Sequence, residues 1–162
     1  MTDHSQAMTA KYRQDYRAPL YWIDSIDLDF QLQEPLTRVT AISRLRRSGE
    51  HNEPLVLDGE GLVLHSVSVD GVPYTRFEQG ESSLTLFNLP AECVLTIVTD
   101  LDPAANTALE GLYKSGDAYC TQCEAEGFRR ITYYLDRPDI LARYSTRITA
   151  DKSQFPFLLS NG

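Results

Sequence analysis

The sequence predicts an all-β fold, an antiparallel β-sandwich or barrel with little helix. Apolar and polar side chains alternate with a period of two in several segments, which is typical of half-buried strands. Turn dipeptides such as Asp58-Gly59 and Asp70-Gly71 separate these segments at short intervals. No segment has the apolar period of about 3.6 residues that marks an amphipathic helix. A run of about seven short strands with regular turns favours a sandwich or barrel.

Two long strands are expected near the start of the sheet. In residues 20–32 six apolar side chains share one parity, whereas Asp27 lies on the other, solvated parity; the six are Leu20, Trp22, Ile26, Leu28, Phe30 and Leu32. Residues 37–47 alternate in the same way, after a turn that contains Pro35. Two alternating runs joined by a short turn predict a hairpin.

Shorter strands follow along the chain. They are expected at residues 55–57, 62–69, 74–77, 83–89, 94–99, 128–135 and 144–150. Residues 100–126 lose the alternation and contain Pro, Gly and small polar residues instead. A loop of this length in a compact domain is usually functional, so a site is expected there. Residues 1–10 are expected to be a disordered tail and residues 11–162 a single sandwich domain.

The charge balance argues against two classes of partner. The 162 residues include 23 Asp and Glu against 15 Lys and Arg, so the formal net charge is −8. This field repels nucleic acid phosphates and anionic lipids, so neither nucleic acid nor a membrane is an expected partner. No apolar run reaches the ~20 residues of a membrane helix, and the N-terminus does not resemble a secretory signal. With only three cysteines, reduced thiols and a cytoplasmic location are expected.

Two features that can signal a metal or a reactive group have simpler explanations. Cys120 and Cys123 have the two-residue spacing of zinc and redox motifs, but Cys93 lies in another expected strand and no fourth ligand has suitable spacing. The neighbouring Glu124 would raise a thiol pKa rather than lower it. His65 shares the parity of the apolar residues around it, so it is expected to be a core or interface histidine. Metal and redox chemistry are therefore disfavoured.

The second half of the long loop is acidic. Residues 110–126 carry four carboxylates and one lysine, namely Glu110, Asp117, Glu124, Glu126 and Lys114. Carboxylate and amide oxygens, such as those of Glu124 and Gln122, can accept charge-assisted hydrogen bonds from an ammonium group. The alternative is a solvated acidic loop without a ligand, and the residues alone leave both open.

The chain ends on a hairpin signal. Residues 156–162 form an apolar run that closes on Asn161-Gly162, the dipeptide most typical of a two-residue hairpin turn. Because a returning strand is expected after such a turn, the sequence predicts a fragment of a longer polypeptide.

Several of these segments together resemble a known family. The resemblance rests on Gly111-Leu112-Tyr113, Gly116, Thr121-Gln122-Cys123-Glu124, Arg129 and Asp136-Arg137-Pro138, and it extends from about Lys11 to Gly162. These segments are similar to the N-terminal domain of the bacterial aminopeptidase N family of gluzincin metallopeptidases. One departure is Ile131-Thr132-Tyr133-Tyr134, where the animal branch has a different stretch.

The resemblance implies a saddle-like β-sandwich followed by a thermolysin-like catalytic domain. The full-length protein would then be a zinc-dependent aminopeptidase, a hydrolase with alanyl aminopeptidase-like activity. The His-Glu-x-x-His and Gly-x-Met-x-Asn motifs of the family are absent from this sequence. The Zn²⁺ ligands are therefore expected in the catalytic domain, and this chain alone is expected to bind no metal and to be inactive.

The resemblance also implies the site residues. Glu124 matches the glutamate that binds the free α-amino group of the substrate, and Gln122 matches the neighbour that lines the first side-chain pocket. Cys123 between them is expected to pack inward. The implied partners are peptides with a free N-terminus and, within the same polypeptide, the catalytic domain. An alternative from another class is a stand-alone β-sandwich binding module that uses its acidic loop.

Overall fold

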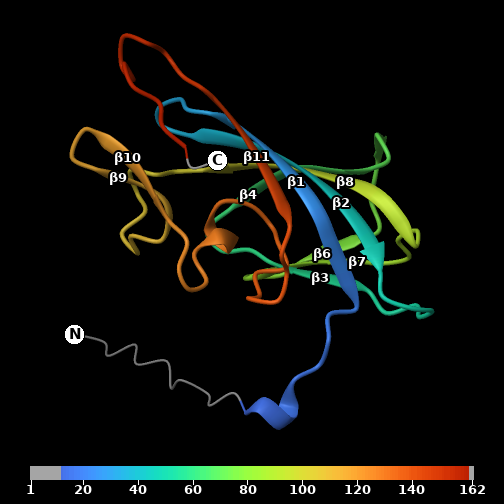
Figure 1. Ribbon diagram of the computed structural model, residues 1–162. Coiled ribbons are helices and arrows are strands. Elements are labelled where there is room, and N and C mark those ends of the chain that lie inside the picture. Colours follow the sequence, from blue (N-terminus) through green and yellow to red (C-terminus); the bar gives the residue numbers. More distant parts are fainter. Residues whose placement is uncertain (1–11, 161–162) are drawn as a thin grey trace.

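The computed structural model describes residues 12–160 and consists almost entirely of strands (Figure 1). The elements in chain order are η1 (Arg13–Asp15), β1 (Tyr21–Gln31), β2 (Thr37–Arg47), β3 (Leu55–Asp58), β4 (Val63–Val69), β5 (Val72–Pro73), β6 (Phe77–Gln79), β7 (Ser83–Leu86), β8 (Glu92–Leu101), β9 (Gly111–Ser115), β10 (Ala118–Gln122), η2 (Phe128–Arg130) and β11 (Arg143–Thr149). The predicted all-β class is confirmed. The expected tail, residues 1–10, and the Asn161-Gly162 turn lie outside the described residues.

The strands form two packed sheets and a separate hairpin. The large sheet has the order β11-β1-β2-β8-β4-β5, and the small sheet has the order β3-β7-β6. Figure 1 shows the small sheet beneath the large one, with the β9–β10 hairpin beside them. The core between the sheets includes Val39 and Ala41 of β2 and Leu84 and Leu86 of β7. One pair departs from the antiparallel expectation, because β11 runs parallel to β1.

A bulge changes the expected face of the first strand. The pairing of β1 with β2 shifts register between Ile23 and Ser25, so one extra residue is inserted there. As a result Tyr21 and Ile23 are buried before the bulge, and Ile26 is buried after it. The prediction that one parity is buried from Leu20 onward is therefore wrong before the bulge and correct after it.

Two predictions for the second half of the chain are wrong. Residues 100–126 are not a continuous loop, because β9 and β10 form a hairpin whose turn contains Gly116 at a φ of 59°. Residues 128–135 are not a strand but begin with the short helix η2, and only Tyr134 forms an isolated bridge, to Asp58. Because residues 131–134 are all buried, their alternating residue types do not correspond to two faces of a strand.

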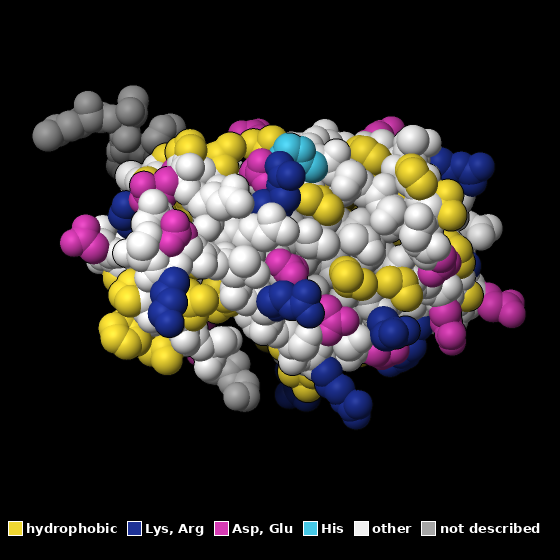
Figure 2. Space-filling model, turned by 90° about the horizontal axis from the view of Figure 1, so that it is seen from above, with side chains coloured by type: hydrophobic (Ala, Val, Ile, Leu, Met, Phe, Trp, Pro, Cys, Tyr) yellow, Lys and Arg dark blue, Asp and Glu magenta, His cyan; other side chains and the backbone are white. Residues whose placement is uncertain are grey.

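The outward face of the large sheet carries paired charges. Arg38 and Asp100 are direct cross-strand partners on β2 and β8, and the Arg38 Nε donates to Asp100 Oδ1 at 2.8 Å. His65 was expected in the core or at an interface, but a register shift in β4 leaves it exposed, with its Nε2 2.6 Å from Asp100 Oδ2. Figure 2 shows acidic and basic side chains intermixed on the face seen from above. No helix within residues 12–160 is long and apolar enough to cross a membrane.

Candidate functional site

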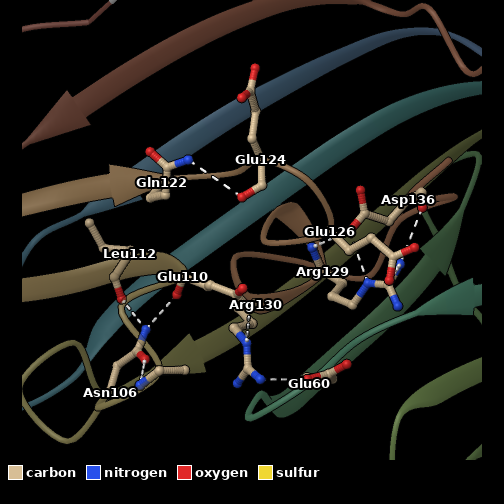
Figure 3. A network of polar contacts seen from close by, with 11 residues as sticks. Glu60, Asn106, Glu110, Leu112, Gln122, Glu124, Glu126, Arg129, Arg130 and Asp136 are labelled. Carbon is tan, nitrogen blue, oxygen red and sulfur yellow. Dashed lines mark hydrogen bonds and ion pairs between the residues drawn. The ribbon is translucent and has the colours of Figure 1, made fainter. Parts of the chain in front are cut away.

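The β9–β10 hairpin brings the two predicted site residues together. Gln122 is the last residue of β10 and pairs with Gly111, the first residue of β9. Glu124 lies in the turn that follows, and the Gln122 Nε2 donates to its carbonyl oxygen at 3.4 Å. Both residues are exposed. In Figure 3 the Glu124 carboxylate points away from the polar network at the base of the turn.

Glu124 differs from the other carboxylates near it. Glu110 lies 3.4 Å from the Arg130 guanidinium, and Glu126 lies 3.4 Å from the guanidinium of Arg129. Within residues 12–160 the Glu124 carboxylate has neither a hydrogen bond nor an ion pair. An exposed carboxylate without a partner is ready to accept hydrogen bonds from a cation.

The lysine of the acidic segment is held away from Glu124. Lys114 Nζ donates to Glu34 Oε1 at 2.6 Å, and the hydroxyl of Tyr119 donates to the same oxygen at 3.2 Å. The Lys114 and Tyr119 hydrogen bonds lower the pKa of Glu34, and the Glu34 hydrogen bond raises the pKa of Lys114. These contacts join the hairpin to the β1–β2 turn, so Lys114 does not neutralise the turn that carries Glu124.

Two glycines allow the turn to pack tightly against the hairpin. A Cβ on Gly127 would lie 2.5 Å from the Gln122 carbonyl oxygen and 3.1 Å from the Cys123 Cα. A Cβ on Gly111, whose φ is 71°, would lie 2.6 Å from the Cβ of Arg130. Because contacts this short exclude a side chain, only glycine permits the close approach that fixes residues 122–127.

An enclosed ion pair lies at the base of the turn. The Arg129 Nε donates to Asp136 Oδ2 at 2.9 Å, the Arg129 backbone N–H donates to the same oxygen at 3.2 Å, and the Nη2 donates to the Asp136 carbonyl at 3.2 Å. Burial disfavours the charged guanidinium, but the hydrogen bond to Asp136 and the carboxylates of Asp58, Asp136 and Glu126 outweigh it and raise the Arg129 pKa. The charged form of Arg129 is therefore favoured.

A second set of contacts anchors the start of β9. The Asn106 Nδ2 donates to the carbonyl oxygens of Glu110 at 2.7 Å and Leu112 at 2.9 Å, and its Oδ1 accepts the Ala108 N–H at 3.1 Å. Figure 3 shows this anchor beside the hairpin. Sequence reasoning missed Asn106, because its partners are backbone groups that no residue pattern identifies. A turn-forming Asn in a loop was the only available signal.

The cysteines do not form a reactive or metal-binding pair. Cys93, Cys120 and Cys123 are free. Burial, with a smaller effect of Asp136, raises the pKa of the half-buried Cys123 thiol, whereas a reactive thiol needs a lowered one. Within residues 12–160 no three His, Cys, Asp or Glu side chains are grouped so that they could hold a metal ion. The described residues therefore do not fit a zinc site.

An apolar cavity of about 870 Å³ lies beneath the hairpin. It is lined by strands β1, β10 and β11 and by residues 154–160, with Phe30, Tyr119, Cys123, Phe128 and Tyr144 among its walls. The cavity places Cys123 on the inward side, whereas Gln122 and Glu124 do not line it. Phe157 and Leu159 along its rim are 86% and 90% exposed.

The fold and this turn define a β-sandwich domain that presents an exposed carboxylate, Glu124, on the turn after a hairpin. A family model described as the Peptidase M1 N-terminal domain matches residues 23–162, and the chain belongs to this family. The resemblance inferred from the sequence motifs is thus confirmed.

Named relatives agree with the family. The chain is 58% identical to aminopeptidase N of Escherichia coli (strain K12) over 158 residues, which are 98% of this chain and 18% of that protein. It is 52% identical to aminopeptidase N of Haemophilus influenzae over 156 residues, 94% of this chain and 18% of that protein. The chain therefore spans about a fifth of the length of these relatives.

Solved structures share the fold. Legionella pneumophila aminopeptidase A, in complex with aspartic acid, is 32% identical and superimposes with a TM-score of 0.86 over 94% of this chain and 18% of that chain. An M1 zinc metallopeptidase from Deinococcus radiodurans is 19% identical, with a TM-score of 0.66 over 80% of this chain and 32% of that one, and shares the fold alone.

Proposed function

We propose that the chain is the substrate-anchoring N-terminal domain of a zinc-dependent aminopeptidase that removes N-terminal amino acids from peptides. Glu124 binds the free α-amino group of the substrate, and Gln122 flanks it. The observation that carries this proposal is the unpaired Glu124 carboxylate on a tightly braced turn. The family match and the aminopeptidase names of the relatives support the reaction class.

The chemistry of the turn suits an α-ammonium group. A carboxylate accepts charge-assisted hydrogen bonds from a cation, and the attraction grows when bound substrate excludes water. The Gln122 Nε2 already donates to the Glu124 carbonyl, so the Gln122 Oε1 is free to accept from the same ammonium. Anchoring the N-terminus selects peptides that have one and places the first peptide bond at a fixed distance, which is a positioning effect.

The rest of the enzyme lies outside this chain. The zinc ligands and the hydrolytic groups belong to the catalytic part of the polypeptide, so this chain alone has no peptidase activity. The exposed Phe157 and Leu159 and the apolar cavity beside them pack against that part. The enzyme acts on cytoplasmic peptides. The chain covers 18% of each relative's length, which supports the assignment of the catalytic groups to another part of the polypeptide.

Replacing Glu124 in the full-length enzyme tests the proposal. Glu124→Ala should cost about 2–4 kcal/mol of transition-state binding, or about 30- to 1000-fold in kcat/KM, the scale for removing one partner of a desolvated charge pair. Steady-state kinetics on a peptide with a free N-terminus measure it. Asp117→Ala is the matched control, because Asp117 is an exposed carboxylate in the hairpin turn and forms no salt bridge within residues 12–160. An unchanged kcat/KM for Glu124→Ala, or an equal loss for the control, would refute the anchoring role.

A further inference from the structure

We propose that Arg129 is a positioning residue for Glu124: its bonds to Asp136 hold the turn of residues 123–127 in the orientation that meets the substrate. This inference rests on the function proposed above. It assigns to Arg129 the task of holding the turn that carries Glu124. If the turn were mobile, ordering it and Glu124 on binding would reduce the net free energy of substrate binding. A rigid base beneath the turn removes that cost.

The Arg129–Asp136 pair has the enclosure that a rigid base needs. The two side chains are 16% and 11% exposed, and among the ion pairs within residues 12–160 no other has both partners so enclosed. Burying an ion pair costs desolvation free energy, and this cost is offset only when both charged groups are well hydrogen-bonded. Here three hydrogen bonds join residue 129 to residue 136, and the guanidinium fork fixes the direction of two of them.

The pair is tied to the small sheet on one side. The Asp136 N–H donates to Asp58 Oδ2 at 3.2 Å, and Asp58 is the last residue of β3. The Arg129 carbonyl oxygen accepts the Glu60 N–H at 3.0 Å. Both ends of the ion pair are therefore fixed to the chain that leaves the small sheet.

On the other side the pair reaches the turn itself. The Arg129 guanidinium lies 3.4 Å from Glu126 Oε2, and the Gly127 N–H closes the turn by donating to the Cys123 carbonyl at 3.0 Å. The Arg130 N–H in turn donates to the Gly127 carbonyl at 3.1 Å. Figure 3 shows Arg129 and Asp136 at the base of the turn and the Glu124 carboxylate directed away from them. Arg129 therefore acts through the backbone of the turn and neither touches the substrate nor neutralises Glu124.

A double-mutant cycle in the full-length enzyme tests the role. Arg129→Lys keeps the positive charge but loses the planar fork. It should lower kcat/KM for an amino-acyl anilide with a free α-amino group by about 10- to 100-fold, the scale of a misplaced anchoring group. In a Glu124→Ala background the same change should have almost no further effect, because the group that it positions is already absent.

A matched control and a second variant complete the experiment. Arg137→Lys removes the two-point hydrogen bonding of Arg137 to Asp139, at 2.7 and 2.8 Å, on the same segment but away from the turn, and it should leave kcat/KM unchanged. Asp136→Asn keeps the size of the side chain and one acceptor oxygen, so it should reproduce the Arg129→Lys result. If Arg129→Lys does not fold, Asp136→Asn tests the positioning role in its place.

Three outcomes would overturn the inference in distinguishable ways. If Arg129→Lys and Asp136→Asn leave kcat/KM unchanged while Glu124→Ala lowers it, the anchoring role stands and the positioning role fails. If Arg129→Lys lowers kcat/KM equally with and without Glu124, Arg129 supports the whole fold rather than this side chain. If Glu124→Ala itself has no effect, the proposed function fails together with the inference.

Discussion

The hydrogen bond between Gln122 and Glu124 leaves two acceptor groups of these residues available. The single hydrogen bond between them uses the Gln122 amide nitrogen and the Glu124 carbonyl, so a carboxylate and an amide oxygen remain available. Glu110 and Glu126, which the sequence groups with Glu124 in one acidic segment, are instead paired with arginines. The number of carboxylates in the segment is therefore larger than its unpaired negative charge.

Replacing Gln122 separates the two roles. Gln122→Ala in the full-length enzyme should lower kcat/KM less than Glu124→Ala, because a neutral acceptor contributes about 1 kcal/mol. It should also change the preference for the N-terminal side chain, since Gln122 is expected to line that pocket. Kinetics on a panel of amino-acyl anilides measure both effects, and an identical preference profile would count against the pocket role.

At the scale of single residues, the sequence names the candidate side chains but not the contacts that support them. Glu124 and Gln122 follow from a family motif, which records side chains that meet a ligand. The partner of Arg129 is the Asp136 carboxylate, and the partners of Asn106 are the backbone carbonyls of Glu110 and Leu112. Such contacts depend on how loops fold, and no periodicity in the chain predicts them.

At the scale of elements, alternation predicts strands well where one face is buried. β2 follows its predicted pattern over its full length because one face packs on the core. β1 departs from its predicted pattern before the bulge between Ile23 and Ser25 and follows it afterwards, and the residue pattern does not mark this bulge. The β9–β10 hairpin was missed because both strands are short and mostly outside the core, so their pattern is weak.

The faces of the large sheet can be compared with one pair of mutants. Ile26 is fully buried (0% exposed), whereas Ile42 on the neighbouring strand is 38% exposed. Ile26→Ala should destabilise the chain by about 2–5 kcal/mol, because it opens a cavity in the core. Ile42→Ala removes the same atoms and should cost under about 1 kcal/mol. Urea unfolding of both variants measures the difference, and equal losses would contradict the assignment of faces.

The cross-strand contact between β2 and β8 predicts a dependence of stability on pH. The hydrogen bond from Arg38 lowers the pKa of Asp100 against the opposing effect of burial, and His65 lowers it further. A carboxyl with a lowered folded pKa stabilises the fold above its unfolded pKa of about 3.9, and this contribution is lost as the pH falls through the folded value.

Asp100→Asn should therefore destabilise the chain by about 1 kcal/mol near pH 7, the order expected when one partner is half exposed. The difference from wild type should shrink as the pH falls below about 4, where Asp100 of the unfolded wild-type chain begins to take up a proton while the folded carboxylate is still ionised. Free energies of unfolding at several pH values measure this. Asp24→Asn, in the exposed pair with Arg46, is the control and should change little. A gap that stays constant with pH would refute the assignment.

At the scale of the whole molecule, the described surface is uneven. The outer face of the large sheet carries ion pairs such as Arg38–Asp100 and Arg46–Asp24, whereas the C-terminal segment exposes Phe157 and Leu159 beside an apolar cavity. A soluble domain rarely leaves such a patch uncovered. The proposed packing against the catalytic part of the polypeptide accounts for this patch and brings the anchoring turn toward the hydrolytic groups.

The most direct measurement is a crystal structure of the full-length enzyme with a bound amino acid, the kind of complex already solved for the Legionella pneumophila relative. Our account predicts that the α-amino nitrogen of the ligand lies within about 3 Å of the Glu124 carboxylate, with Gln122 beside it. An α-amino group held by other residues, with Glu124 directed to solvent, would contradict the account.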